Sequence, residues 1–294
     1  MKNKKSAHRG GRSTAFTLVE ILVVMGIIAL LAALLIPVLT TVRKMAKEVQ
    51  QKAQFTTIEL ALTAFKNDYG DYPPSHGYDD DGSGGIDPGY FGAQTLAEAL
   101  VGWDMMGFHP NSAWTNSGKD ITGTSMVYLD GSESPAIKEA NLKARKGPYL
   151  ELASANVFKL GDLFPTAPGK DRFVICDVFG VKPVNTGGKL VKAGAPILYY
   201  KANTSSKTID ASASEDLGER IYNRKDNYLF ALFRDGAGPL GDLTKFYEYI
   251  ADPKVSTPAI KWPSNPESYL LISAGPDGRY GTKDDICNFD PSFP

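Results

Sequence analysis

The chain has 294 residues, and its 32 lysines and arginines nearly balance its 33 aspartates and glutamates. This length allows one large domain or two small ones in addition to an N-terminal anchor. Because residues 1–15 carry cations and no acidic residue, the rest of the chain is mildly acidic, and its charge gives no reason to expect nucleic-acid binding.

The N-terminus has a short cationic leader followed by an apolar segment. The leader, residues 1–15, contains Lys2, Lys4, Lys5, Arg9 and Arg12. Residues 21–39 carry no charge, and a helix of that length spans roughly 29 Å, close to the thickness of the hydrocarbon core of a bilayer. Cations before the first apolar segment stay on the cytoplasmic side, so the body of the chain is expected outside. The apolar run is too long for a secretory signal and no small-residue cleavage site follows it, so we expect it to be retained.

A single carboxylate, Glu20, directly precedes the apolar run. An ionised carboxylate at the centre of a membrane helix costs about 2.5–3.5 kcal/mol on insertion scales, and less near a helix end. Glu20 therefore either lies at the cytoplasmic interface, where it reaches water, or has a specific function. The residues directly before it point to such a function.

The segment Ala15-Phe16-Thr17-Leu18-Val19-Glu20 resembles the processing site of type IV prepilins and type II secretion pseudopilins. In that family a dedicated prepilin peptidase cuts before the phenylalanine and methylates the new amino group. The resemblance implies a cut between Ala15 and Phe16, which makes Glu20 the fifth residue of the mature chain. Pro37 falls where the family commonly has a proline that bends the helix, and a membrane helix tolerates it because neighbouring helices re-satisfy the freed carbonyl. The family usually has glycine before the cut, whereas this chain has Ala15.

Cleavage at this position places an ammonium group at Phe16 near the carboxylate of Glu20. Charges about 4 Å apart attract by roughly 4 kcal/mol at an effective dielectric of 20, and the desolvation of both groups reduces the net gain. We hypothesise that the Phe16 amine pairs with Glu20 of a neighbouring subunit and sets the register, while apolar helix faces supply most of the contact. The resemblance implies four kinds of partner: homotypic or related pilin-like subunits, prepilin peptidase, inner-membrane lipid, and a secretion or pilus assembly platform.

The helical pattern continues past the apolar run. Apolar residues recur at spacings of three and four, and these are Val42, Met45, Val49, Ile58, Leu62, Phe65 and Tyr69. Gly70 and the Tyr72-Pro73-Pro74 sequence end the pattern. One helix is therefore expected from about Phe16 to Tyr69, with a transmembrane segment over residues 16–39 and an amphipathic continuation over residues 40–69.

Residues 70–294 are predicted to form an α+β domain, in which an antiparallel β-sheet with large loop insertions packs on the long helix. A short helix is expected over residues 94–100. Short apolar runs predict strands at residues 149–152, 173–176, 197–200, 229–233 and 268–273. Turns are expected at residues 168–169, 186–188 and 235–238. Cys176 and Cys287 are both expected outside the membrane, either bridged or as two buried thiols.

A segment rich in glycine and aspartate, residues 273–286, follows the last expected strand. Three glycines at every third position permit tight turns, and three carboxylates lie within nine residues. Calcium binds six to eight oxygens from carboxylates and main-chain carbonyls, so such a loop can enclose it. The segment is similar to the C-terminal calcium loop of major pseudopilins, and the resemblance implies Asp277 with one or both of Asp284 and Asp285 as ligands. The alternative is a plain turn without a metal.

A second acidic segment, residues 79–87, matches the first nine positions of an EF-hand loop. Its side-chain ligands in a weaker second calcium site would be Asp79, Asp81, Ser83 and Asp87. The twelfth position, which needs a bidentate glutamate, is Tyr90, and nearby prolines leave no evident flanking helix pair. A solvated acidic loop is the favoured alternative.

Signs of catalysis are few. The histidines outside the leader, His76 and His109, are expected to be surface or loop residues, and the sequence has no G-x-S-x-G or H-E-x-x-H motif. We therefore expect a non-enzymatic, pilin-like subunit of a type II secretion pseudopilus or a type IV pilus-like filament. It would be a single-pass inner-membrane protein whose C-terminal domain lies in the periplasm or on an extracellular filament. The alternatives are a membrane-anchored binding or adhesion protein that does not polymerise, and an anchored hydrolase.

Overall fold

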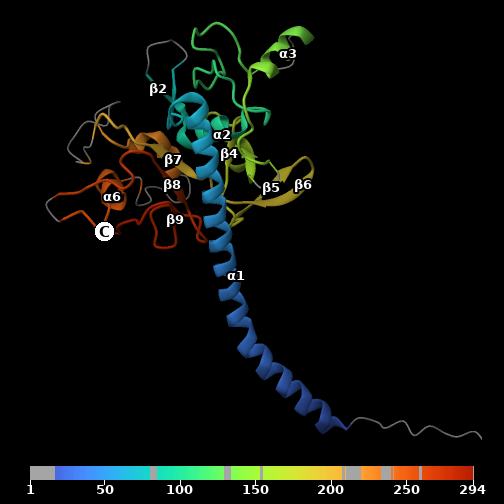
Figure 1. Ribbon diagram of the computed structural model, residues 1–294. Coiled ribbons are helices and arrows are strands. Elements are labelled where there is room, and N and C mark those ends of the chain that lie inside the picture. The colour runs from blue at the N-terminus through green and yellow to red at the C-terminus, as the bar shows by residue number, and fades with distance from the viewer. Residues whose placement is uncertain are drawn as a thin grey trace, which may run out of the picture. The chain divides into compact units, whose positions relative to one another are not determined.

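The computed structural model describes residues 17–79, 85–128, 134–152, 155–206, 209, 220–232, 240, 242–257 and 260–293. The chain divides into two compact units, residues 1–46 and 47–294. Helix α1 (Leu18–Tyr69) is 52 residues long and contributes to both units (Figure 1). The expected α+β class is confirmed, with a long N-terminal helix and small antiparallel sheets.

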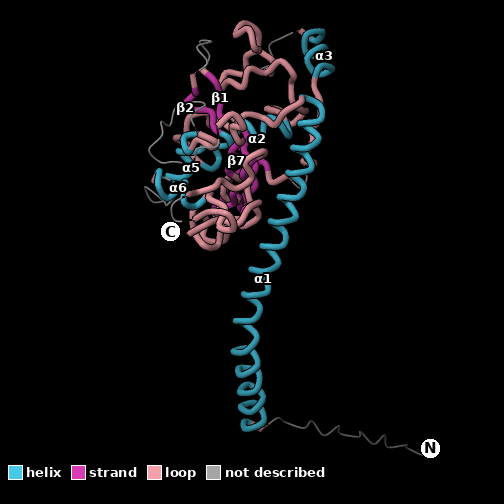
Figure 2. Tube along the Cα trace, turned by 60° about the vertical axis from the view of Figure 1, so that its left-hand side comes forward, coloured by secondary structure: helices cyan, strands magenta, loops and turns pink. Residues whose placement is uncertain are grey.

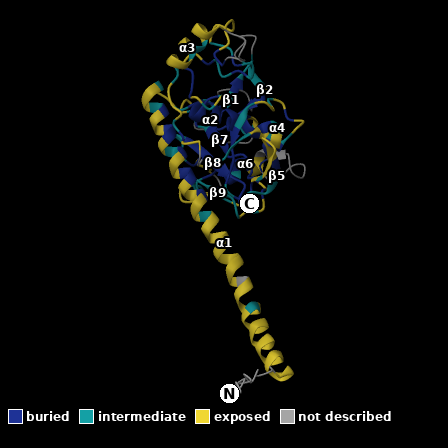
Figure 3. Cartoon of the chain, turned by 90° about the vertical axis from the view of Figure 1, so that its right-hand side faces the viewer, coloured by how far each residue is buried: buried dark blue, intermediate teal, exposed yellow. Residues whose placement is uncertain are grey.

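The part of α1 in the first unit is an exposed apolar helix. Every large apolar side chain that the structure describes between Leu18 and Met45 is more than half exposed (yellow in Figure 3). The helix is long and apolar enough to cross a membrane. It runs through Pro37 without a break, although proline lacks the N–H that would bond to the carbonyl four residues earlier.

The part of α1 in the second unit buries one apolar face. The buried side chains are Phe55, Ile58, Ala61, Leu62 and Phe65, at the spacings of three and four that place residues on one side of a helix. The helix ends at Gly70, whose φ of +86° and N–H bond to the Lys66 carbonyl (2.7 Å) form a glycine C-cap.

The expected apolar stripe is therefore correct from Ile58 onward and wrong before it. Val49 is 68% exposed in the second unit, and Val42 and Met45 are exposed in the first. The residues that face inward next to Val49 are instead Gln51 and Gln54, which are polar and buried.

The described strands form four small antiparallel sheets, rather than the one sheet expected (magenta in Figure 2). Three are hairpins or short pairs: β1 (His76–Tyr78) with β2 (Ile86–Phe91), β3 (Val157–Lys159) with β4 (Phe173–Ile175), and β5 (Lys182–Thr186) with β6 (Lys189–Ala193). The fourth has the order β7 (Leu198–Lys201), β8 (Tyr269–Ser273), β9 (Ile286–Cys287). It joins strands from distant parts of the chain, with Leu198 opposite Ile272.

The second unit also contains short helices. These are α2 (Gly92–Val101), α3 (Pro135–Ala144), α4 (Leu160–Leu163), the 3-10 helix η1 (Arg224–Asn227), α5 (Tyr228–Leu232) and α6 (Leu243–Tyr249). The helix expected at residues 94–100 is confirmed as α2, and three expected strands correspond to β4, β7 and β8. Two expected strands are wrong, because residues 149–152 form no strand and Leu229 lies in α5. A short apolar run fits a buried strand or a buried helical turn equally well. The turn expected at residues 235–238 lies outside the described residues.

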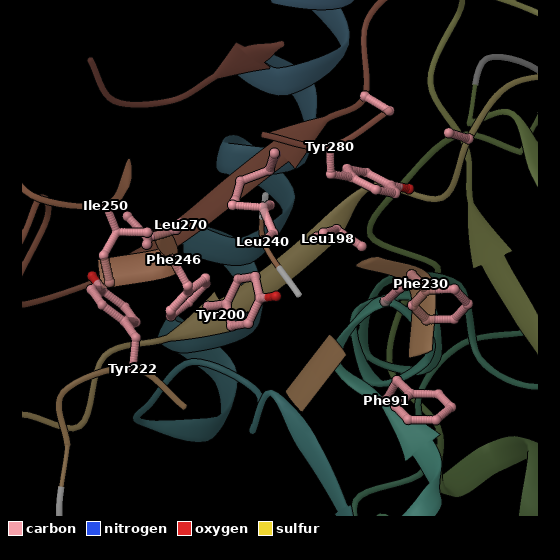
Figure 4. Close-up of a cluster of buried hydrophobic side chains, with 14 of the residues drawn as sticks. Phe91, Leu198, Tyr200, Tyr222, Phe230, Leu240, Phe246, Ile250, Leu270 and Tyr280 are labelled. Atoms are coloured by element: carbon pink, nitrogen blue, oxygen red, sulfur yellow. The ribbon is translucent and has the colours of Figure 1, made fainter. Parts of the chain in front are cut away.

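Both faces of the β7–β8 pair are covered. Leu198 and Tyr200 belong to the cluster shown in Figure 4, together with Phe246 from α6. Ile197 and Tyr199 point the other way, into a second cluster that contains the α1 residues Phe55 to Phe65. This alternation is the period-two pattern of a strand, and because both faces are buried the strand reads as a continuous apolar run. Cys176 and Cys287 are free thiols, and Cys176 is buried while Cys287 is half-buried.

Candidate functional site: the start of the long helix and the C-terminal acidic loop

Thr17 and Glu20 form a capping box at the start of α1. The Thr17 backbone N–H and hydroxyl donate to Glu20 Oε2 (both 2.8 Å), and the Glu20 backbone N–H donates to Thr17 Oγ1 (3.2 Å). These contacts satisfy N–H groups that have no partner inside the helix. The T-x-x-E spacing is a sequence signature for this cap. The predicted processing residues Ala15 and Phe16 lie outside the described residues.

Three polar side chains of α1 attach it to the loop after β4. Lys47 Nζ donates to the Phe179 carbonyl and Gln54 Nε2 donates to the Cys176 carbonyl, each over 3.0 Å. Gln51 Oε1 accepts from the Val178 backbone N–H, also over 3.0 Å. Backbone groups that would otherwise be buried without a partner are thereby satisfied. No periodicity of apolar residues could have identified this contact.

Asp177, in the same loop, links it to the beginning of the C-terminal segment. Its carboxylate accepts from the backbone N–H groups of Phe179 (3.1 Å) and Ala195 (3.2 Å) and from the Ser273 hydroxyl (3.0 Å). Burial raises the pKa of Asp177 to about 6, and these hydrogen bonds oppose the shift. A continuous set of contacts therefore runs from α1 through the loop to the last residue of β8.

The C-terminal acidic loop, residues 274–285, joins β8 to β9 and depends on its glycines. Gly275, Gly278 and Gly281 all have positive φ, as the expected tight turns require. At Gly275 a Cβ atom would lie 2.1 Å from the Asp284 carbonyl oxygen, so no other residue fits there. Tyr280 anchors the loop in the core cluster, where it is visible in Figure 4, and its hydroxyl donates to the Pro196 carbonyl.

Asp277 is exposed on this loop, and Asp284 is half-buried. Asp284 Oδ2 accepts from the Asp277 backbone N–H (3.1 Å), and its Oδ1 accepts from the Thr282 hydroxyl (2.6 Å). Asp277 Oδ1 accepts from the Arg279 backbone N–H (2.7 Å). The folding of the loop thus brings two of the predicted ligands, Asp277 and Asp284, together. The Thr282 hydroxyl lies between Asp284 and the third predicted ligand, Asp285.

Asp285 points inward instead. Its Oδ2 accepts from the Tyr249 hydroxyl (2.5 Å) and the Gly281 backbone N–H (2.7 Å), and Thr282 Oγ1 lies 3.3 Å from its Oδ1. Burial raises the pKa of Asp285 to about 7, and its hydrogen bonds lower it by less. No ion pair to Asp285 is found among the described residues. A buried carboxylate in this position is stabilised by a bound cation or by a proton.

The donor chemistry of the loop suits calcium more than a transition metal. Two carboxylates, one threonine hydroxyl and main-chain carbonyls are hard oxygen donors, and the third carboxylate, Asp285, is half-buried beside them. Across the described residues, however, no group of three or more histidine, cysteine, aspartate or glutamate side chains is arranged to hold a metal ion. The carboxylates bond to backbone amides and hydroxyls rather than converging on one point.

The described residues of the second acidic segment, Asp79 and residues 85–87, lie at the ends of the paired strands β1 and β2. Asp81 and Ser83 lie outside the described residues. Gly77 pairs with Asp87, and the Asp79 backbone N–H donates to the Gly85 carbonyl (2.9 Å). Strands therefore flank the segment where an EF-hand has helices, and this favours the interpretation as an acidic loop.

The two histidines are less exposed than expected. His109 is 7% exposed and lies in a loop, where its Nδ1 accepts from the Asn111 backbone N–H, and burial lowers its pKa. His76 lies in β1, and its side chain is 15% exposed. The expectation of surface or loop positions is confirmed for His109, which lies in a loop although it is buried, and is wrong for His76, which lies in a strand and is mostly buried.

Comparison with protein-family models, with curated proteins and with solved structures finds no match for this chain.

Proposed function

We propose that this chain is a pilin-like structural subunit of a type II secretion pseudopilus or a type IV pilus-like filament. The observation that carries the proposal is the combination of a cationic leader, the segment from Ala15 to Glu20, the uncharged run that follows and the position of Pro37. Each feature alone is weak, and together they are typical of this one class. The role is structural and not catalytic.

The form of α1 supports this proposal. An apolar helix whose side chains are more than half exposed needs lipid or other helices to cover it. The same helix continues into a folded α+β unit, where its second part buries one apolar face. A subunit of this kind can exchange lipid for neighbouring helices when it polymerises, without refolding residues 47–294.

In the proposed mechanism, prepilin peptidase cuts between Ala15 and Phe16 in the inner membrane and methylates the new N-terminus. The Phe16 ammonium then competes with the Thr17 hydroxyl and backbone N–H for the Glu20 carboxylate. Pairing with Glu20 of a neighbouring subunit fixes the axial register, and the apolar side chains supply the contact area. The assembly platform and related subunits are the partners.

Calcium is the proposed ligand of the C-terminal loop. Asp284, Asp277 and the Thr282 hydroxyl would hold the ion with main-chain carbonyls, and Asp285 would contribute its buried charge. The ion supplies a positive charge that fastens the connection between β8 and β9. It has no chemical role.

Replacing Glu20 by leucine in the native host tests the polymerisation mechanism. We expect the fraction of the subunit recovered in sheared or cross-linked filaments to fall at least tenfold, because the Phe16 ammonium loses its partner. The membrane-bound amount should stay unchanged, since leucine favours insertion.

The control is Thr17→Ala, which removes the capping hydroxyl and leaves the carboxylate. A cap of this type is worth about 1 kcal/mol, so assembly should be nearly normal. If Glu20→Leu assembled as well as the parent, or if Thr17→Ala were as defective as Glu20→Leu, pairing between subunits would be wrong.

A further inference from the structure

His76 and Asp226 form a buried pair that the proposed structural role does not use. His76 Nδ1 lies 3.5 Å from Asp226 Oδ1, and the Asp226 side chain is 3% exposed. Among the described residues, neither ring nitrogen of His76 nor Asp226 Oδ1 has a hydrogen-bond partner. Leaving a buried polar group without a partner costs about 1–3 kcal/mol, so a ring nitrogen without any partner, beside an ion pair too long for a hydrogen bond, indicates a binding site rather than a core.

The surrounding chain holds this pair in place. Ser75 Oγ donates to Asp226 Oδ2 (2.5 Å). The next residue, Asn227, accepts from the Ala93 backbone N–H (2.9 Å) and donates to the Tyr199 carbonyl (2.7 Å). The Asp226 carboxylate is thus held by Ser75, and the backbone beside it is fixed by the contacts of Asn227 to α2 and β7.

Two cavities share His76 and Asp226 as lining residues. One, of about 570 Å³, is bounded by the segment after α1, by residues 201–205 and by η1. The other, of about 610 Å³, is mostly apolar. The cavity of about 570 Å³ is lined mainly by hydroxyl, amide and charged side chains, and the rings of Tyr72 and Tyr78 also line it. Both volumes lie in the range of small-molecule sites.

We propose that the 570 Å³ cavity binds a neutral sugar. A sugar hydroxyl both donates and accepts, so it can donate to Asp226 Oδ1 and bond to the His76 ring at the same time. Amide side chains at Asn203 and Asn223 line the same space. An aromatic ring such as that of Tyr78 offers a flat apolar surface to the C–H face of a sugar ring. This inference goes beyond the filament role and does not depend on it.

The charges of the cavity disfavour ionic ligands. Asp226 and Glu267 repel an anion, while Arg220 and Lys201 repel a cation. Lys201 is paired with Asp71 (2.6 Å), so the lining contains charges of both signs in close balance. A neutral ligand with many hydroxyl groups fits this balance.

Calorimetric titration of the full chain, in micelles of a zwitterionic detergent without a sugar headgroup, tests the proposal. The probes are glucose, N-acetylglucosamine, cellobiose and maltose, with inorganic phosphate and putrescine as charged comparisons. We expect saturable binding of at least one sugar and none of phosphate or putrescine. Asp226→Asn should weaken that sugar at least tenfold, because an acceptor with full charge is lost.

Two further variants complete the design. Tyr78→Ala removes the aromatic surface, which also packs against the His76 ring with the ring centroids 5.0 Å apart, and it leaves Asp226 unchanged. It should weaken binding too, and it serves as the test variant if Asp226→Asn fails to fold. Asp162→Asn changes an exposed carboxylate that does not line the cavity and should bind as the parent does. Failure of all four sugars to bind the natively folded parent would overturn the proposal. So would binding that neither cavity variant weakens, or binding of phosphate or putrescine in place of a sugar.

Discussion

Replacing Leu62 by alanine is expected to lower the free energy of unfolding of the second unit by about 2–5 kcal/mol. Leu62 is fully buried in the cluster that joins α1 to β7 and β8. The substitution removes buried methyl groups. It leaves a cavity in the cluster, where α1 and α2 are the helices that pack on β7 and β8. Urea unfolding of the full chain, followed by tryptophan fluorescence, measures the change.

Leu60 provides a matched control in the same helix. It lies two residues away and is 67% exposed. Leucine and alanine have similar helix propensities, so Leu60→Ala should change the free energy of unfolding by no more than about 0.5 kcal/mol. Equal effects of the two substitutions would mean that α1 does not dock through the face seen in the structure.

Calcium is expected to raise the melting temperature of the chain, and Asp285→Asn should abolish that effect. At a calcium concentration of 100 times Kd, the stabilisation expected from binding is about 2.7 kcal/mol. The asparagine keeps the shape of Asp285 and its bonds from Tyr249 and Gly281 but removes the charge that the ion would balance. Differential scanning calorimetry of the parent and of Asp285→Asn, each in calcium and in chelator, measures both effects on the melting temperature.

In the presence of a chelator, the free energy of unfolding is expected to depend on pH through the same carboxylate. Burial raises the pKa of Asp285 to about 7 in the folded chain, above the usual value of about 3.9. The group therefore stabilises the fold fully below pH 4, and this contribution is lost as the pH rises to 7. Over that interval the loss is about 1.4 kcal/mol per pH unit. Asp177, with a pKa of about 6, acts in the same direction up to pH 6.

Asp285→Asn should flatten this pH dependence and make the chain in chelator at least as stable at pH 8 as the parent. Asp171→Asn, an exposed carboxylate outside the loop, should keep both the calcium response and the pH profile of the parent. A calcium response that survives in Asp285→Asn, or one that is absent in the parent, would contradict the proposed site.

The sequence predicts those parts of the fold that depend on local pattern. The helix end at Gly70 follows from glycine and the prolines after it, and β7 and β8 follow from their apolar runs. The helix face before Ile58 could not be predicted. Gln51 and Gln54 face inward because backbone groups 127 and 122 residues away need hydrogen-bond partners, and Val49 faces outward in consequence.

The acidic loop shows the same division. Its three positive-φ glycines are predicted by their spacing, and the proximity of Asp277 to Asp284 follows from the turns they make. Asp284 and Asp285 are adjacent in sequence and both half-buried, yet only the Asp285 carboxylate accepts from Tyr249, a residue of α6. The pairing of His76 with Asp226 was equally unpredictable, because 150 positions separate them and the packing of η1 against α2 and β7 brings them together.

The mature N-terminus, measured by mass spectrometry on protein purified from its native host, tests the central claim most directly. We predict a chain that begins at Phe16 with a methylated amino group, because filament assembly through Glu20 requires that new amine. A chain that still begins at Met1 would contradict the account and favour a static membrane anchor.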